Sequence, residues 1–268
     1  MTAPPDDDPK GGALLDTRGI ADRFEKLIRK TMFRNYSGGV HFDPVNKTIN
    51  VDEPDDMNRN EQPRWRCEYF EAAKPFIDAG EWPGQDRIKL ATRYAWAIPC
   101  EAAIRKLVEI ADAQPYGLLE VGAGSGYWAH HVACMGGKIL ATDCDPPKTG
   151  RNTFGHRTAY YDVAAISGHS AADAYGIGRA LFMCWPPYDT PAAYDALSAY
   201  RGSTLVYVGE GSGGCNGDDR FWDLLEEQWK LREVIEIPQW PGLNDAMRVF
   251  VEDPQEVPID PDLTIFDL

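Results

Sequence analysis

The stretch that decides the fold is LLEVGAGSGYWAHHVACMGGKILATDCDP, residues 118–146. A short apolar run leads to Glu120, a glycine-rich turn follows, and a helical pattern precedes a second apolar run that ends at Asp143. This order predicts a strand, a loop, a helix and a second strand, with an acidic residue at the tip of each strand. Glycines lack a Cβ, so they let the backbone turn sharply and let a ligand lie against it. The turn holds three of them, Gly122, Gly124 and Gly126.

Two kinds of nucleotide cofactor compete for such a unit. In the dinucleotide fingerprint the third glycine stands three positions after the second, but this chain has Tyr127 there. A ring at that position obstructs the close passage of a pyrophosphate over the helix N-terminus. Glu120 also repels phosphates and suits a cationic ligand instead. Asp143 sits where a carboxylate accepts hydrogen bonds from both hydroxyls of a ribose.

The pattern E-x-G-x-G-x-G at residues 120–126 resembles motif I of the class I S-adenosylmethionine (SAM) methyltransferases. The resemblance implies SAM as the cofactor, a cation without phosphates. It also places Asp162, in TAYYDVAA, at the motif III position, where an acidic side chain accepts from the adenine amino group; the alternative is that Asp162 caps the next helix. The cofactor-binding residues that it implies are Glu120, Gly122, Gly124, Gly126, Tyr127, Asp143 and Asp162.

The remainder of the chain alternates strand-like and helix-like segments, which predicts a mostly parallel sheet with helices on both faces. The connection QWPGLND, residues 239–245, is too short for a parallel crossover, so the last two strands should pair antiparallel. The fold class is therefore α/β, and the resemblance implies the seven-stranded Rossmann-like methyltransferase sheet with an antiparallel C-terminal hairpin. We expect strands at 117–121, 138–143, 157–161, 179–184, 203–208, 231–237 and 246–252.

The sequence predicts that the chain has three parts. Residues 1–16, rich in Pro, Gly and Asp, should form a disordered tail. Residues 17–113 should form a helical extension or cap, followed by a SAM-binding catalytic domain over 114–268. Within the extension, residues 37–62 read as a lid or an ordered flap with one short strand at 48–51. Helical patterns cover residues 20–32, 64–79 and 87–112, the last broken at Pro99.

A second distinctive segment is RALFMCWPPYD, residues 179–189, in which an apolar strand runs into a rigid double-proline loop. Ligands bind beyond the carboxyl ends of strands in open α/β sheets, so this loop should lie beside the cofactor. A free backbone carbonyl beside an aromatic face suits a planar amine or azole. The predicted catalytic and substrate-binding residues of this loop are Trp185, Pro186, Pro187, Tyr188 and Asp189.

The double-proline loop resembles motif IV of amino-methyltransferases, which begins with Asn, Asp or Ser and continues Pro-Pro and an aromatic residue. Pro186, Pro187 and Tyr188 match, but Trp185 replaces the oxygen-bearing first residue, and indole has no acceptor. This departure puts N-methylation of DNA adenine or cytosine in doubt. More widely, residues 94–250 resemble a group of methyltransferase-like proteins, which is specific for SAM and unspecific for the substrate.

Three further residues complete the predicted site. Glu210 follows the strand LVYVG and is either a general base or a solvated loop carboxylate. Trp240 stands between the last two strands and could form a wall of the substrate site, and His41 lies in the presumed flap within reach as a base.

Charge and cysteine usage limit the partners. A formal net charge of −15 and the lack of a basic cluster disfavour nucleic acid. The six cysteines show no C-x-x-C pair, so no metal site is expected, and no apolar run is long enough to span a bilayer. The sequence thus predicts a cytoplasmic SAM-dependent methyltransferase that N-methylates a small planar heterocycle or amine. A small-molecule O-methyltransferase, a nucleic-acid amino-methyltransferase and a non-enzymatic SAM-fold binding module stay open, as does a homodimer.

Overall fold

The computed structural model describes residues 40–43, 48–51, 65–150 and 152–253, and the chain divides into two units at Gln62. In the first unit, β1 (Val40–Asp43) pairs antiparallel with β2 (Thr48–Val51), which confirms the predicted strand at 48–51. The predicted tail, most of the flap and the helix at 20–32 lie outside the described residues.

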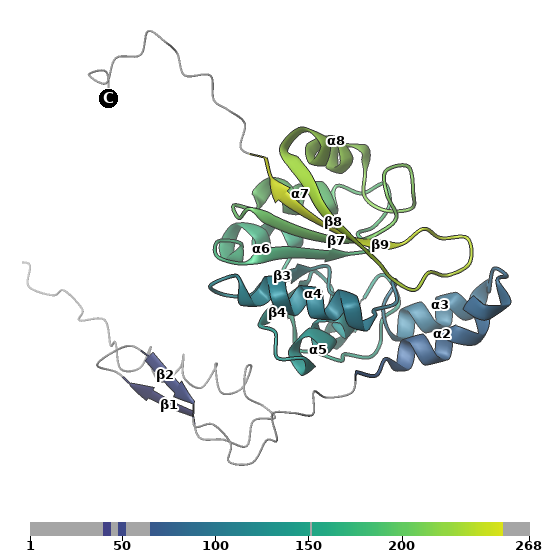
Figure 1. Cartoon of the computed structure of the whole chain (residues 1–268), viewed down its shortest axis with the longest axis horizontal. Coiled ribbons are helices and arrows are strands. Elements are labelled where there is room, and N and C mark those ends of the chain that lie inside the picture. The colour runs from purple at the N-terminus through teal and green to yellow at the C-terminus, as the bar shows by residue number, and fades with distance from the viewer. Residues whose placement is uncertain (1–39, 44–47, 52–64, 151, 254–268) are drawn as a thin grey trace, which may run out of the picture. The chain divides into compact units, whose positions relative to one another are not determined.

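The second unit is built on a sheet of seven strands in the order β5-β4-β3-β6-β7-β9-β8 (Figure 1). The first five strands of this order are parallel, and β9 runs antiparallel to both β7 and β8. This arrangement confirms the predicted fold class, including the antiparallel hairpin at the C-terminal end. The strands are β3 (Leu118–Val121), β4 (Ile139–Asp143), β5 (Val163–Ala165), β6 (Ala180–Cys184), β7 (Thr204–Gly209), β8 (Trp229–Glu236) and β9 (Ala246–Glu252).

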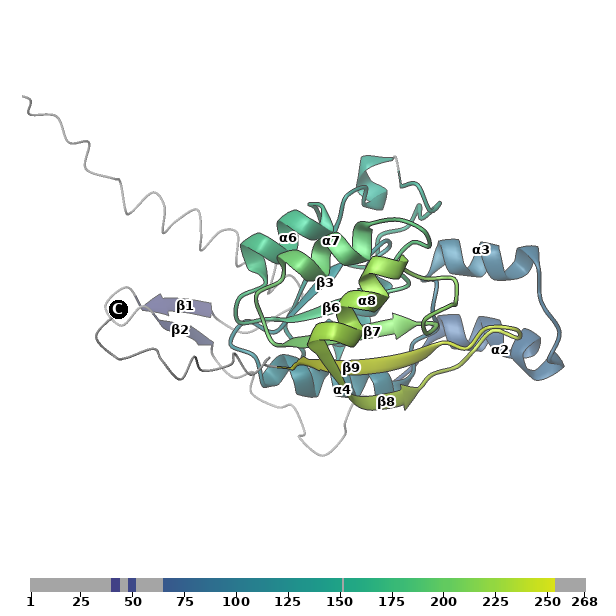
Figure 2. The ribbon, with the colours of Figure 1, turned by 90° about the horizontal axis from the view of Figure 1, so that it is seen from above.

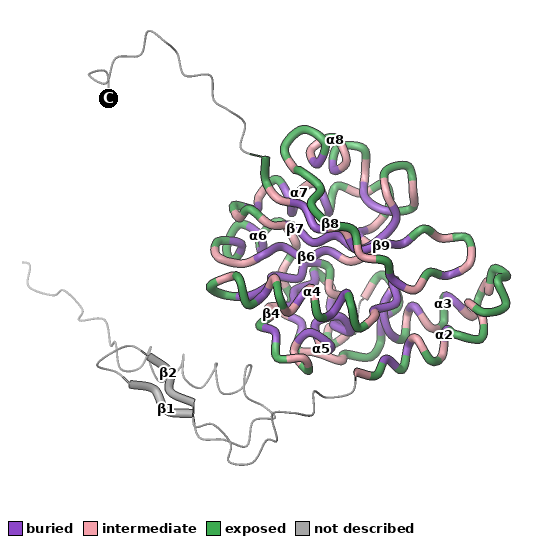
Figure 3. Tube along the Cα trace, viewed as in Figure 1, coloured by how far each residue is buried: buried purple, intermediate pink, exposed green. Residues whose placement is uncertain are grey.

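Helices cover both faces of the sheet, which is why its central strands are apolar without alternation. Leu118 belongs to the core beneath α4 and α5, and its neighbour Leu119 belongs to the core beneath α6, α7 and α8. Figures 2 and 3 show these layers and the buried strands between them. The helices are α4 (Glu101–Asp112), α5 (Tyr127–Cys134), α6 (Gly168–Tyr175), α7 (Ala192–Ala199) and α8 (Asp219–Gln228).

Two more helices, α2 (Glu68–Ala79) and α3 (Gln85–Arg93), extend past the end of the sheet at which the parallel strands finish (Figures 1 and 2). The β8–β9 connection holds α2 there, because Trp240 Nε1 donates to the Tyr69 hydroxyl over 3.1 Å. The helix predicted at 87–112 is two helices, α3 and α4, with Pro99 in the irregular stretch between them. Among the described residues, no helix has the length and apolar character needed to cross a membrane.

The strand predicted at 157–161 is wrong. That segment runs along the glycine loop instead, where Tyr160 N donates to Ser125 O over 2.8 Å. The edge strand β5 begins two residues later, with Val163 opposite Ala141 and Ala165 opposite Asp143. The segment 157–161 therefore pairs with the loop through its backbone, and the Tyr161 side chain reaches β4, where its hydroxyl donates to Ile139 O over 3.2 Å.

Candidate functional site

The glycine loop follows β3, and all three of its glycines have positive φ, 69°, 53° and 72° in chain order. A Cβ at Gly126 would stand 2.8 Å from Tyr161 Cβ, and one at Gly124 would stand 2.8 Å from the His156 ring. At Gly122 a Cβ would meet nothing within 4 Å. The loop therefore packs closely at two glycines and leaves open space at the first.

Asp143, at the end of β4, is bonded to this loop. Its Oδ2 accepts from Gly124 N over 2.9 Å, and its Oδ1 accepts from Asp145 N over 2.8 Å. The sequence thus predicted correctly that the acidic tip of the second strand lies beside the glycines. A carboxylate oxygen has a second lone pair, so both atoms can still accept from a ligand hydroxyl.

Glu120 is the least satisfied group of the loop region. Its side chain is buried, with 1% exposed, and Oε2 has no hydrogen-bond partner among the described residues. Burial and the nearby charge of Asp143 raise the pKa of this carboxyl to about 8. A positive charge beside it would lower that pKa and offset the cost of burying the carboxylate.

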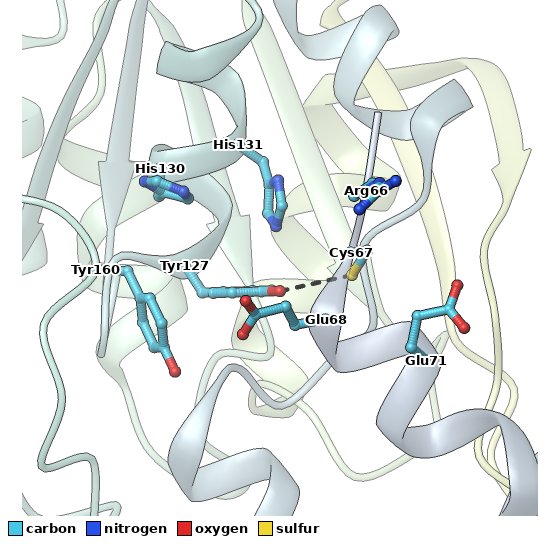
Figure 4. A pocket seen from close by; sticks show the side chains of 8 residues that line it. All are labelled: Arg66, Cys67, Glu68, Glu71, Tyr127, His130, His131 and Tyr160. Carbon is cyan, nitrogen blue, oxygen red and sulfur yellow. Dashed lines mark hydrogen bonds between the residues drawn. The ribbon is translucent and has the colours of Figure 1, made fainter. Parts of the chain in front are cut away.

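Tyr127, the first residue of α5, is buried on the side of the loop that faces α2. Its hydroxyl accepts from Tyr69 N over 3.2 Å and lies 3.7 Å from Cys67 Sγ. The ring is one wall of a cavity of about 790 Å³ between α5 and the start of α2 (Figure 4). No sequence pattern pointed to this cavity. Its other lining residues are Arg66, Cys67, Glu68, Glu71, His130, His131 and Tyr160.

Asp162 precedes β5 and so stands at the amino end of that strand, away from the edge where Asp143 lies. The side chain is exposed and forms an ion pair with Lys148 at 3.3 Å. It does not cap the next helix, because Ser167 is the N-cap of α6 and accepts from Ser170 N. Its role in binding adenine stays a prediction, and the observed position does not support it.

The double-proline loop is held at both ends in a strained shape. Trp185 and Asp189 have φ of 53° and 51°, which costs a non-glycine residue about 1–3 kcal/mol. Backbone bonds hold these positions: Trp185 N donates to Val208 O over 2.8 Å, and Asp189 N donates to Gly217 O over 3.0 Å. Such over-determined strain is typical of functional loops.

The expectation of a free carbonyl in this loop is wrong for two of its residues. Pro186 O accepts from Gly217 N at 3.3 Å and from Asn216 Nδ2 at 3.4 Å, and Pro187 O accepts from the Thr190 hydroxyl. Both carbonyls therefore already accept hydrogen bonds from other residues of the chain. Tyr188 is 66% exposed.

Glu210 follows β7, as the sequence predicted, but both of its oxygens are bonded. Oε2 accepts from Cys215 N over 3.0 Å, and Oε1 accepts from Asn244 N over 3.1 Å. The alternative of a solvated carboxylate is therefore wrong, because the residue is buried and joins two loops.

Trp240 is also buried, against Tyr69 and Phe76 of α2, and so holds that helix to the β8–β9 connection. His41 lies on β1, but its side chain lies outside what the structure describes. No cluster of three His, Cys, Asp or Glu side chains within the described ranges could hold a metal ion.

Three residues that the sequence analysis missed as site residues surround Trp185. Trp96 stacks on its ring at 5.7 Å, the Arg87 guanidinium lies 4.8 Å above it, and Asp245 Oδ1 accepts from its Nε1 over 2.8 Å. Burial raises the pKa of Asp245 to about 6. The partners of Trp185 come from distant segments of the chain. The one sequence feature that pointed to them was the high density of aromatic residues over 65–96.

Comparison with known proteins gives structural likeness only. No family model matches, and no curated protein matches. Solved structures with a similar fold include TrmN from Thermus thermophilus (16% identity, TM-score 0.37, 56% of this chain and 48% of that one) and the 23S rRNA methyltransferase ErmE (20%, 0.38, 58% and 69%). A third is magnesium protoporphyrin IX methyltransferase (ChlM) from Synechocystis PCC 6803 with bound SAM (11%, 0.40, 91% and 100%). This chain thus spans about half of the TrmN structure. With every one of these TM-scores below 0.5, we argue the function from this chain's own residues.

Proposed function

We propose that this protein is a SAM-dependent methyltransferase that acts on a nitrogen atom of a small planar heterocycle or amine. The observation that carries the proposal is Glu120, a buried carboxyl with one unpartnered oxygen that directly precedes a glycine loop. A buried carboxylate is stable only when it is paired with a cation or fully hydrogen-bonded. A cationic cofactor would provide that charge, whereas a dinucleotide would bring phosphates.

The residues of the glycine loop fit SAM in three respects. The open space over Gly122 lets a ligand lie against the backbone. Asp143 keeps lone pairs that can accept from ribose hydroxyls. Glu120 is buried without a positive charge beside it, which a cationic cofactor would supply. The ring of His156 lies against Gly124 and limits the approach on that side. When bound, SAM would supply an electrophilic methyl group on its sulfonium. The chain's own residues would then hold the acceptor in line with it.

The choice of a nitrogen acceptor rests on the state of the candidate bases. A neutral amine or azole nitrogen already carries a lone pair, so its methylation needs no strong base. Glu210 is a poor base, because two backbone N–H groups already occupy its oxygens. Trp185 offers a ring to a planar acceptor, and the net charge of −15 favours a small molecule over nucleic acid. A cytoplasmic location and a homodimer stay predictions of the sequence.

Calorimetric titration with SAM, S-adenosylhomocysteine and NAD tests the cofactor. We expect the first two to bind the wild type and NAD not to bind. Glu120→Gln should lower SAM affinity about tenfold or more, since a charge interaction in a buried site is lost, and should lower S-adenosylhomocysteine affinity less. Asp143→Ala should weaken both ligands.

Glu226→Gln is the matched control, because this glutamate is exposed on α8 and belongs to no predicted site. We expect it to bind SAM like the wild type. Binding of NAD in place of SAM would overturn the proposal. Absence of binding by all three ligands would favour a non-enzymatic module with the same fold.

A further inference from the structure

Arg87, on α3, is a buried cation without a hydrogen-bond partner in the part of the chain that the structure describes. Only 4% of it is exposed, and its guanidinium lies among three indole rings, 4.8 Å from Trp185, 5.3 Å from Trp96 and 5.6 Å from Trp82. The ring faces stabilise the positive charge. They do not satisfy the N–H groups in the guanidinium plane, and Nε and Nη2 have no acceptor among the described residues.

Nε and Nη2 form the edge of a guanidinium that pairs with an oxyanion. Two exposed arginines of this chain use that edge in this way. Arg105 donates from Nε (3.0 Å) and Nη2 (2.6 Å) to Glu101, and Arg220 donates from Nε (3.0 Å) and Nη2 (2.9 Å) to Asp218. Arg87 presents the same pair of donors from a buried position, where leaving them unbonded costs more.

Asp245 lies against the same indole as Arg87. Its Oδ1 accepts from Trp185 Nε1, and its Oδ2 is buried and without a partner. The Asp245 side chain thus stands at the edge of the ring and the guanidinium over its face, and no ion pair within 4.0 Å joins the two. An unsatisfied cation and an unsatisfied carboxyl therefore share one aromatic platform, next to the carboxyl end of β6.

We propose that Trp185, Arg87 and Asp245 bind the methyl acceptor, and that this acceptor carries an acidic group, a carboxylate or a phosphate. The Nε–Nη2 edge of Arg87 binds the acidic group, the planar part lies against the indole cluster around Arg87, and Asp245 Oδ2 accepts from an N–H of the acceptor. The inference rests on the proposed function for the reaction, but the anion site exists independently of the cofactor.

Trp82, in the turn between α2 and α3, is the most exposed of the three indoles around Arg87. This indole is 56% exposed, and its Cε3 lies 3.6 Å from where a Cβ on Gly242 would stand. Gly80 and Gly84 flank the turn at φ of 69° and 56°, with open space around both. In this proposal, the acceptor reaches the guanidinium by displacing this half-exposed ring.

The test uses the full chain and three probes: 4-aminobenzoate, phenyl phosphate and the uncharged 4-aminobenzamide. Binding is followed by tryptophan fluorescence and calorimetry. We expect an anionic probe to bind the wild type more tightly than the amide, and the preferred anion to identify the acidic group as carboxylate or phosphate. Arg87→Lys keeps the charge but loses the paired donors, so affinity should fall about tenfold; Arg87→Gln should lose more.

Arg93→Gln is the matched control. Arg93 lies on the same helix and is exposed, with its guanidinium 5.1 Å from the Tyr94 ring and a side-chain hydrogen bond to Tyr160. It should bind the anion like the wild type. Equal affinities for the amide and the anions, unchanged anion binding by Arg87→Gln, or no anion binding by the wild type up to the solubility limit would each overturn the proposal.

The competing explanation is an internal Arg87–Asp245 pair, bridged by water, with no role in ligand binding. A double-mutant cycle in urea with Arg87→Gln and Asp245→Asn distinguishes the two. Strong coupling in the absence of any anion effect would overturn the proposal. SAM titration of the same variants separates the two proposals. Unchanged SAM affinity with lost anion binding supports the anion site at Arg87. Failure of SAM to bind the wild type would contradict the proposed cofactor but not the anion site.

Discussion

The loops that follow β3 and β7 differ in how far their polar groups are satisfied. Each lies beside a glutamate at the same end of the sheet: Glu120, near the end of β3, and Glu210, directly after β7. Glu210 has both oxygens bonded, and Asn216 completes its loop by accepting from Glu210 N and donating to Pro186 O. Glu120 keeps an oxygen without a partner, and the space over Gly122 stays open. The comparison teaches that the number of unsatisfied groups, not residue type, separates a structural carboxylate from a ligand-binding one.

Removing Glu210 tests the structural half of the comparison and should have the largest effect. Glu210→Ala removes the charged acceptor of two partly buried hydrogen bonds, from Cys215 N and Asn244 N, at about 2 kcal/mol each. We expect the free energy of unfolding in urea to fall by about 4 kcal/mol. SAM affinity of the folded fraction should change little. A fully stable Glu210→Ala variant with lost methyl transfer would make Glu210 a catalytic base and break the comparison.

Substitutions of two glycines in the loop after β3 test whether that loop leaves open space for a ligand. Gly126→Ala brings a Cβ to 2.8 Å from Tyr161 Cβ at a φ of 72°, so we expect a loss of stability of about 3 kcal/mol. Gly122→Ala carries the cost of positive φ alone, about 1 kcal/mol, because nothing lies within 4 Å. Urea unfolding measures both values. The milder variant should nevertheless lose SAM affinity, since its methyl group fills the open space; SAM binding like the wild type would show that no ligand lies there.

The fold was predictable because its signals are local. Six of the seven strands of the sheet lie within two residues of their expected ends, since each is an apolar run bounded by turn residues. The seventh, β5, has three residues and sits at the sheet edge, so it has too few side chains to form a pattern. The more aromatic segment 157–161 was taken for it, and this error misplaced Asp162.

The site divides in the same way. The glycine loop and Asp143 were predictable, because the glycines and the acidic residue that ends the next strand lie within about 30 residues of one another in the sequence. The contacts of Trp185 with Arg87 and Asp245 join three distant segments, so no spacing in the sequence could show them. Whether the Glu210 oxygens are free depends equally on the loops that fold over them.

The pH dependence of stability tests Glu120 directly. Its pKa of about 8 in the folded state lies above that of an unfolded glutamate, about 4.3, so the folded chain binds the extra proton between these values. Stability therefore falls as pH rises through this window, by up to about 1.4 kcal/mol per pH unit. Glu120→Gln removes this dependence, and its free energy of unfolding relative to the wild type should increase from pH 5 to pH 8.

The exposed glutamate Glu81 provides the control, because Glu81→Gln should follow the wild-type profile. Asp245 contributes a loss of the same sign at lower pH, but it is present in all three proteins and cancels in the differences. Saturating SAM should flatten the wild-type profile, since a cation beside Glu120 favours the ionised form and releases the proton on binding. A wild-type profile that stays parallel to that of Glu120→Gln would mean that Glu120 is as well satisfied as Glu210, and the contrast between the two loops would be lost.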